Sequence, residues 1–444
     1  MLEKIGVASL DDLLQQIPPD LRLQRPLALP APLTELELEQ EVRRLAARNV
    51  GSSRRSCFLG GGVYDHFVPS VVDEVAGRGE FYTAYTPYQP EASQGSLQAF
   101  FEYQSMMCAL TGLDAANASL YEGASAVAEA ILMAERSLDR SGPIFVSAAL
   151  HPETLSTIHT YLARWRERLC VIPTVRGVTD WDWLARRLND QTLAVVFQHP
   201  NFFGCLEDAA RAVSLAHRVG ALGIQSFDPI SLGIMKRPGD YGVDIAVAEG
   251  QSLGIPLQYG GPYLGVLACR QQFLRKMPGR IVGRTVDRLG RPCFVLNLQT
   301  REQHIRREKA TSNICTNQGL MALRAAVYLA LQGPQGMREV AQLCCRKAHY
   351  AAQRLQEVAG VSLMFAAPFF KEFCIRLPGD LEHVLQQLRQ AGCDVGPSLQ
   401  RFPCPAGMSV QDYQQGCLVA VTEARTREEI DHLAEAMAQA LSRS

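Results

Sequence analysis

Short apolar runs alternate with helical patterns between Gly123 and Ala268, and this alternation constrains the fold more than any other feature of the sequence. The runs are Ile144–Val146, Leu193–Phe197, Ala221–Ile224, Ile245–Ala248 and Gly265–Ala268. The helical patterns are Gly123–Arg140, Trp181–Leu188 and Leu206–Val219. Strands that are apolar on both faces are typical of a sheet covered by helices on both sides. We therefore expect an α/β domain with a mostly parallel sheet, over residues 61–333.

The region before this domain has two predicted helices and little apolar periodicity between them. Ser9–Ile17 is the first, with Ser9 as a cap and Asp12 three residues later. The second starts at Thr34, with Glu37 three residues later. Such a segment cannot bury a core of its own. We expect residues 1–60 to form a helical arm that packs on another domain or subunit.

The pattern changes again after Gly333. A long helix is predicted over Met337–Val358, and shorter helices over Leu381–Gln390 and Arg427–Leu441. Strand-like segments lie among them at Val361–Phe365, Phe373–Leu377 and Cys417–Thr422. Residues 334–444 are therefore expected to form a smaller C-terminal α+β domain.

The charge balance and the cysteines restrict the classes of partner and the compartment. The 444 residues carry 44 basic and 45 acidic side chains, so the net charge of -1 gives no electrostatic reason to expect nucleic acid or an anionic membrane as a partner. The 13 cysteines form no CxxC pair, which favours free thiols in a reducing compartment. The histidines show no metal-ligand spacing. We expect a cytoplasmic protein with no membrane segment and no metal site.

Three polar motifs follow predicted strands or open a predicted helix. Gly123 and Ser125 start a strong helix, where unpaired N–H groups can bind a phosphate. Asn201 follows one strand and can hydrogen-bond a ring oxygen, and Asp228 follows the next and can pair with a pyridinium nitrogen. Each motif also has an ordinary interpretation: a plain helix start, a turn-rich loop, and a helix cap or turn aspartate.

The order of these motifs is that of pyridoxal-phosphate (PLP) enzymes with the aspartate aminotransferase-like fold (PLP fold type I). In that fold a lysine follows the next strand and forms the Schiff base. Here the strand Asp244–Gly250 is followed by Gln251, which cannot form an imine. The chain has only six lysines. Lys236 and Lys309 remain open as alternative anchors, which would make the chain a self-sufficient PLP lyase.

Two further segments are unusual. Phe81–Gln94 contains three tyrosines and two prolines before a helix, which suits the wall of a site or an interface. Arg301–Thr316 is dense in cations and then in small hydrogen-bonding residues, which suits phosphate or carboxylate binding. A packed loop and a solvated charged helix face are the ordinary interpretations.

These two segments, together with Gly62–Pro69, resemble the alpha subunit of glycine cleavage system P-proteins. The resemblance extends over nearly the whole chain. It implies PLP fold type I and an enzyme, glycine dehydrogenase (decarboxylating), that decarboxylates glycine and passes the aminomethyl group to the lipoyl arm of H-protein. It also implies that PLP is held by a partner beta subunit in an alpha2beta2 assembly, not covalently by this chain.

The resemblance assigns two sets of site residues, and it leaves this chain no Schiff-base lysine. The first set faces a site shared with the beta subunit: Tyr85, Tyr88, Gln94, Thr311, Ser312 and Asn313. The second set is the vestige of a disabled cofactor site: Gly123, Ser125, Asn201 and Asp228. A non-catalytic scaffold or regulatory subunit of the same complex is the alternative function.

Overall fold

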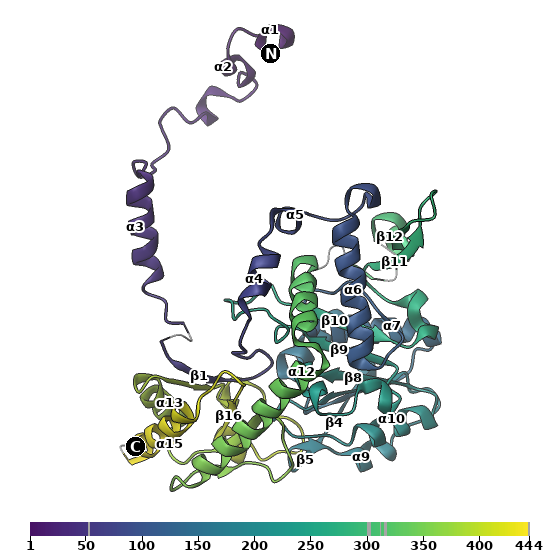
Figure 1. Cartoon of the computed structure of the whole chain (residues 1–444), viewed down its shortest axis with the longest axis vertical. Helices are drawn as coiled ribbons and strands as arrows, with labels where there is room; N and C mark the ends of the chain where they lie inside the picture. Colours follow the sequence, from purple (N-terminus) through teal and green to yellow (C-terminus); the bar gives the residue numbers. More distant parts are fainter. Residues whose placement is uncertain (52–53, 300–302, 311, 315–317, 443–444) are drawn as a thin grey trace. The chain divides into compact units, whose positions relative to one another are not determined.

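The computed structural model describes residues 1–51, 54–299, 303–310, 312–314 and 318–442, and the chain divides into two compact units, residues 1–51 and 52–444 (Figure 1). The first unit contains α1 (Leu2–Ile5), α2 (Leu10–Leu13) and α3 (Glu35–Ala46). Both predicted capping boxes are confirmed: Ser9 with Asp12 caps α2, and Thr34 with Glu37 caps α3. Neither helix contains a buried residue.

A seven-stranded sheet forms the centre of the second unit. Its spatial order is β2-β10-β9-β8-β7-β3-β4. The strands are β2 (Ala115–Ala116), β3 (Ile144–Ser147), β4 (Leu169–Ile172), β7 (Ala194–His199), β8 (Leu222–Phe227), β9 (Ile245–Glu249) and β10 (Gly265–Cys269). The five strands from β9 to β4 are parallel, and β10 is antiparallel to both of its neighbours. The predicted mostly parallel sheet is confirmed.

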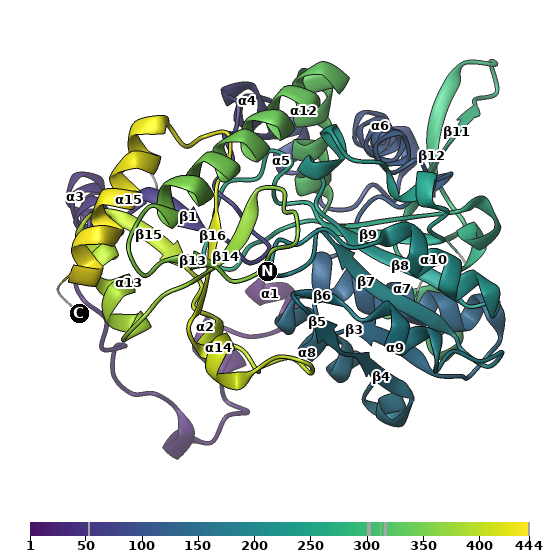
Figure 2. The same cartoon turned by 90° about the horizontal axis from the view of Figure 1, so that it is seen from below.

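Helices cover both faces of this sheet (Figure 2). One face packs on α7 (Gly123–Leu138) and α8 (Pro152–Tyr161). The other packs on α6 (Gln94–Thr111), α9 (Trp181–Ala185), α10 (Ala209–Arg218) and the first half of α12 (Gly319–Gln356). Successive β7 side chains alternate between the two cores, with Val195 and Phe197 on one side and Val196 on the other. This alternation explains why the strands are apolar on both faces.

The long helix α12 joins the sheet region to the C-terminal region (Figure 2). It has 38 residues and begins at Gly319, so the predicted start at Met337 is wrong. Gly333 has a non-helical backbone (φ 57°) and is followed by Pro334, and this pair marks a kink rather than an end. Residues before the kink pack on the sheet, and Ala348 and Leu355 beyond it pack in the C-terminal core.

The C-terminal region holds two small sheets. One is antiparallel, with the order β13-β14-β16: β13 (Ser362–Leu363), β14 (Glu372–Arg376) and β16 (Gly416–Ala420). The other pairs β1 (Ser56–Leu59) in parallel with β15 (Cys393–Gly396). The helices α13 (Leu381–Gln390), α14 (Val410–Gln414) and α15 (Arg427–Ser442) complete it. Residues 56–59 therefore belong with the C-terminal strands, although we expected them in the arm.

The remaining elements lie around these cores. They are α4 (Ser70–Ala76), α5 (Gly79–Tyr82), β5 (Thr174–Val175), β6 (Val178–Thr179), the hairpin β11 (Ile281–Val286) and β12 (Pro292–Asn297), and α11 (Gln303–Arg306). Among the residues described, no helix is both long enough and apolar enough to cross a bilayer.

Candidate functional site

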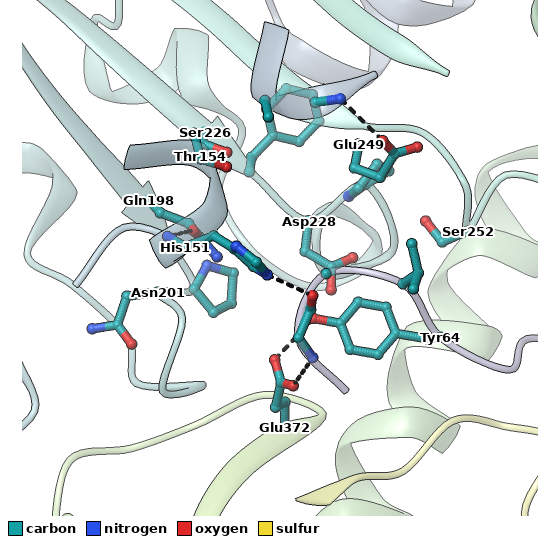
Figure 3. A pocket seen from close by; sticks show the side chains of 18 of the residues that line it. Tyr64, His151, Thr154, Gln198, Asn201, Ser226, Asp228, Glu249, Ser252 and Glu372 are labelled. Atoms are coloured by element: carbon teal, nitrogen blue, oxygen red, sulfur yellow. Dashed lines mark hydrogen bonds between the residues drawn. The ribbon is translucent and has the colours of Figure 1, made fainter. Parts of the chain in front are cut away.

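A cavity of about 280 Å³ lies at the carboxyl ends of the parallel strands (Figure 3). Gly123, Asn201 and Asp228, three of the residues predicted for the cofactor site, line it, whereas Ser125 lies further into α7 and does not. The segment 61–64 and the residues Lys371 and Glu372 close the cavity from the C-terminal side. Ligands of open α/β sheets bind at this edge, so the cavity is the candidate site.

Asp228 already has a cationic partner from the same chain. The Nζ of Lys371 lies 2.7 Å from Asp228 Oδ2 and 3.0 Å from His66 Nε2. It also lies 3.8 Å from the centre of the Tyr64 ring, and the Lys371 side chain is 2% exposed. In a PLP enzyme this carboxylate would pair with the protonated ring nitrogen. Lys371 instead supplies that positive charge within the protein.

The helix N-terminus that was expected to bind phosphate is also occupied by side chains of the protein. The Gly123 N–H donates to Glu249 Oε2 (3.0 Å), and the Ser125 N–H donates to Glu122 Oε1 (2.7 Å). Glu249 Oε1 accepts from the Gln251 and Leu264 N–H groups (2.9 and 3.2 Å). Burial raises the pKa of Glu249 to about 7, although these hydrogen bonds favour its ionised form.

The Asn201 side chain is fully used by the surrounding loop. Its amide nitrogen donates to Gly177 O and Glu207 Oε1, both at 2.8 Å, and its oxygen accepts from the Phe203 and Cys205 N–H groups. Figure 3 shows this amide turned away from Asp228. Asn201 therefore lines the cavity but offers no free donor to a ring oxygen, contrary to the sequence-based expectation.

Gln251 occupies the position expected for the Schiff-base lysine, and its side chain has a structural role. Its Oε1 accepts from the Tyr64 N–H (2.9 Å), and its Nε2 donates to Tyr64 O (3.1 Å) and Ile255 O (2.8 Å). Lys236 and Lys309 are exposed and do not line the cavity. Of the six lysines, all of which the structure describes, only Lys371 lines it.

These residues do not fit pyridoxal phosphate. The ring-nitrogen partner is paired with an ammonium, the helix N-terminus is paired with carboxylates, and the anchoring amine is replaced by an amide. Lys371 cannot serve as the anchor, because its nitrogen lies at Asp228. The cofactor's aldehyde and ring nitrogen are at opposite ends of the ring, so an amine at Asp228 is at the wrong end.

Comparison with known proteins gives the family. The glycine cleavage system P-protein family matches residues 1–437. The "Probable glycine dehydrogenase (decarboxylating) subunit 1" of Desulforamulus reducens is 49% identical over 438 residues, which cover 98% of this chain and 96% of that protein. The chain belongs to the glycine cleavage system P-protein family. A relative of the same name from Carboxydothermus hydrogenoformans is 48% identical, covering 98% of this chain and 96% of that protein.

Solved structures agree with the P-protein assignment. A crystal structure of glycine decarboxylase (P-protein) in inhibitor-bound form has a TM-score of 0.90 and 46% identity, covering 99% of this chain and 97% of that chain. A sphingosine-1-phosphate lyase from Burkholderia pseudomallei has a TM-score of 0.67 at 16% identity, covering 95% and 93%, and supports the fold alone. The expected PLP fold type I and the resemblance to P-proteins are confirmed.

The described residues of the expected shared site lie outside the cavity of this P-protein chain. Tyr85 is 83% exposed. The Tyr88 hydroxyl accepts from Arg280 Nη2 (3.0 Å). Gln94 forms hydrogen bonds with both the N–H and the carbonyl of Phe294, at 2.9 Å each, and so fixes the β11–β12 hairpin to the start of α6.

The second half of this set lies in the segment after α11. Ser312 is buried, and its hydroxyl accepts from the Ile314 N–H (3.0 Å). Asn313 is exposed. Thr311 lies outside the described residues, as does Cys315. Among those described, none lines the cavity.

Sequence reasoning missed a buried polar network that extends from Asp228 into the C-terminal region. Beyond Lys371, His66 Nδ1 lies 2.7 Å from Glu423 Oε2, to which Cys344 Sγ also donates (3.3 Å). Within the described ranges, His66, Cys344 and Glu423 are the one group close enough to hold a metal. The Lys371 ammonium, 3.0 Å from His66, opposes a cation there, and hydrogen bonds already pair these atoms.

Two signals in the sequence pointed to the missed residues of the P-protein cavity. Lys371 and Glu372 are charged residues at the start of an apolar strand, and Glu249 ends the strand that precedes Gln251. Charges at the end of a buried strand need partners. The sequence alone does not identify those partners, because they come from distant segments.

Proposed function

We propose that this chain is the alpha subunit of a glycine dehydrogenase (decarboxylating), and that a second P-protein subunit, beta, holds pyridoxal phosphate. The family and the names of the relatives support the glycine-cleaving role. The division between two subunits rests on one observation: Gln251 stands where the Schiff-base lysine is required, and it is locked by three hydrogen bonds.

The cofactor, when bound to the beta subunit, supplies an electron-withdrawing ring for the loss of carbon dioxide from glycine. The aminomethyl group then passes to the lipoyl arm of H-protein. This chain contributes the wall of the shared cleft, through Tyr85 and Tyr88, and polar groups near the substrate, through the segment that contains Ser312 and Asn313. It contributes no covalent step.

Four exposed tyrosine side chains support the partner interaction. Tyr82, Tyr85, Tyr88 and Tyr259 are 68, 83, 46 and 92% exposed. Tyrosine is enriched at protein interfaces, where its ring is buried and its hydroxyl finds a partner. We propose an alpha2beta2 assembly in the cytoplasm. The free thiols of the described cysteines support a reducing compartment.

Reconstitution tests this proposal. The chain is purified alone and together with the beta subunit, and glycine–bicarbonate exchange and visible absorbance are measured for each. We expect the chain alone to be colourless and inactive, and the pair to be coloured and active. A borohydride-sensitive visible band in this chain alone would refute the division of roles.

Substitutions in the reconstituted complex of the two subunits distinguish a shared active site from the alternative, a scaffold or regulatory subunit. Tyr88→Phe and Asn313→Ala change two side chains that we propose to face the shared cleft, and Asn313 is exposed in this chain. A lower turnover with unchanged association supports the shared site. Unchanged turnover for both variants would favour a scaffold or regulatory subunit.

A further inference from the structure

We infer that the residual cofactor site of this chain excludes pyridoxal phosphate because its own side chains, Lys371 and Glu249, take the places of the cofactor's two charged ends. Restoring the lysine at position 251 alone would therefore not restore binding. The inference deepens the proposed function, since it explains how this subunit stays free of cofactor.

The first replacement is at the ring-nitrogen end. The ammonium of Lys371 is in ion-pair contact with Asp228 and lies over the Tyr64 ring. The pair is nearly fully buried, with side-chain exposures of 2 and 14%. A pyridinium ring that approached Asp228 would meet this ammonium, and displacing it would leave a buried cation without its partner.

The second replacement is at the phosphate end. Glu249 places a carboxylate oxygen 3.0 Å from the Gly123 N–H, where a helix N-terminus binds an anion. A Cβ on Gly123 would lie 2.8 Å from the Glu249 backbone nitrogen, so the two segments already touch. A phosphate group would have to displace Glu249 from the Gly123 N–H or share the helix end with it.

Residues 61–64, which line one side of the cavity, are held in place by hydrogen bonds to residues around it. Glu372 accepts from the Gly61 N–H (2.6 Å) and from the Tyr64 hydroxyl (2.8 Å). The His151 ring bonds Gly61 O (2.7 Å). The Gln251 amide forms hydrogen bonds with the Tyr64 N–H and carbonyl, so a lysine at position 251 would also break these two contacts to residues 61–64.

The test compares wild type with Gln251→Lys and with the triple variant Glu249→Ala/Gln251→Lys/Lys371→Met. Each is titrated with pyridoxal phosphate, reduced with borohydride and mapped by mass spectrometry. We expect no saturable binding by wild type or by Gln251→Lys. The triple variant should bind pyridoxal phosphate saturably and carry the reduced adduct at position 251. Glu249→Ala/Gln251→Met/Lys371→Met is the control without an amine.

The outcomes separate the inference from the proposed function. Saturable binding by Gln251→Lys alone, with an adduct at position 251, would overturn the inference and leave the division of subunits intact. So would a folded triple variant that does not bind. A reducible adduct in wild type would instead refute the proposed function.

A second variant decides the case in which the triple variant does not fold. Glu249→Ala/Gln251→Lys keeps the buried Lys371–Asp228 pair and frees the Gly123 N–H. We expect it to bind inorganic phosphate, seen as phosphorus NMR line broadening, whereas Gln251→Lys does not. Equal broadening in both would overturn the phosphate-end replacement.

Discussion

The side-chain amide of Gln251 forms two hydrogen bonds with the backbone of Tyr64, one to the N–H and one to the carbonyl. The two residues are 187 positions apart, so this contact joins the end of the parallel sheet to the segment that leads out of the N-terminal region. The position at which we expected a Schiff-base lysine therefore holds a side chain that joins two distant segments of the chain.

We predict that Gln251→Ala destabilises the protein by about 2–4 kcal/mol, because it leaves the Tyr64 N–H and the Ile255 carbonyl buried without the partners that Gln251 supplies, and leaves the Tyr64 carbonyl with the His66 N–H as its remaining donor. Denaturant unfolding of the two proteins measures the difference. The control is Gln258→Ala at an exposed position, which should stay within about 0.5 kcal/mol of wild type. Equal losses of unfolding free energy for the two substitutions would contradict the structural role of the Gln251 side chain.

The Lys371–Asp228 pair predicts a strong coupling between two substitutions. Lys371→Met or Asp228→Asn alone leaves a buried charge uncompensated and should cost about 3–5 kcal/mol of unfolding free energy. The Asp228→Asn substitution keeps the oxygen that accepts from the Ile230 N–H. The loss of unfolding free energy in the double variant should therefore be smaller than the sum of the losses in the two single variants. If denaturant unfolding shows that the two losses simply add, Lys371 and Asp228 do not interact in the folded protein.

Glu372 predicts a pH dependence of stability. Burial raises its pKa to about 7, from 4.5 for the ordinary side chain. Because the folded-state pKa is raised, the stabilisation is present below pH 4.5 and is lost as the pH rises through 7. Wild type should therefore lose about 2.5 kcal/mol relative to Glu372→Gln between pH 5 and pH 8.

The variant suits this comparison because glutamine can still accept from the Gly61 N–H and can donate to the Tyr64 hydroxyl. The measurement is the unfolding free energy of both proteins at each pH. A difference that is constant with pH, or that grows in the opposite direction, would show that Glu372 is ionised in the folded protein throughout.

The exposed tyrosine Tyr85 predicts a loss of association without a loss of folding. Tyr85 is 83% exposed, so Tyr85→Ala should leave the unfolding transition of the isolated chain unchanged. Its affinity for the beta subunit should fall by about 1–2 kcal/mol, as for an aromatic interface residue. Calorimetric titration measures this. Tyr161→Ala, at a half-exposed tyrosine on α8, is the control that should bind like wild type.

Local chemistry explains which parts of the fold were predictable. Ser9 with Asp12 and Thr34 with Glu37 satisfy helix N–H groups within one turn, so the caps are readable from the sequence. The five buried strand runs appear as β3 and β7 to β10, because a strand covered on both faces must be apolar throughout. The start of α7 at Gly123 follows from the same kind of local signal.

The site was less predictable because its partners are distant in the sequence. Gly123, Asn201 and Asp228 reach one cavity as the strand order implies. Nothing in the sequence around Lys371 reveals that its ammonium pairs with Asp228, since a lone lysine before a strand is usually solvated. The early start of α12 was missed for another reason: Gly333 and Pro334 normally end a helix, but here they only kink it.

The two occupied ends of the residual site have an evolutionary consequence. A single reversion at position 251 would break the contacts to Tyr64 and still meet Lys371 and Glu249, so it would lower stability and restore no chemistry. Any change that gives this cavity a cofactor must therefore alter several side chains together, because each of them already completes a contact of the protein interior.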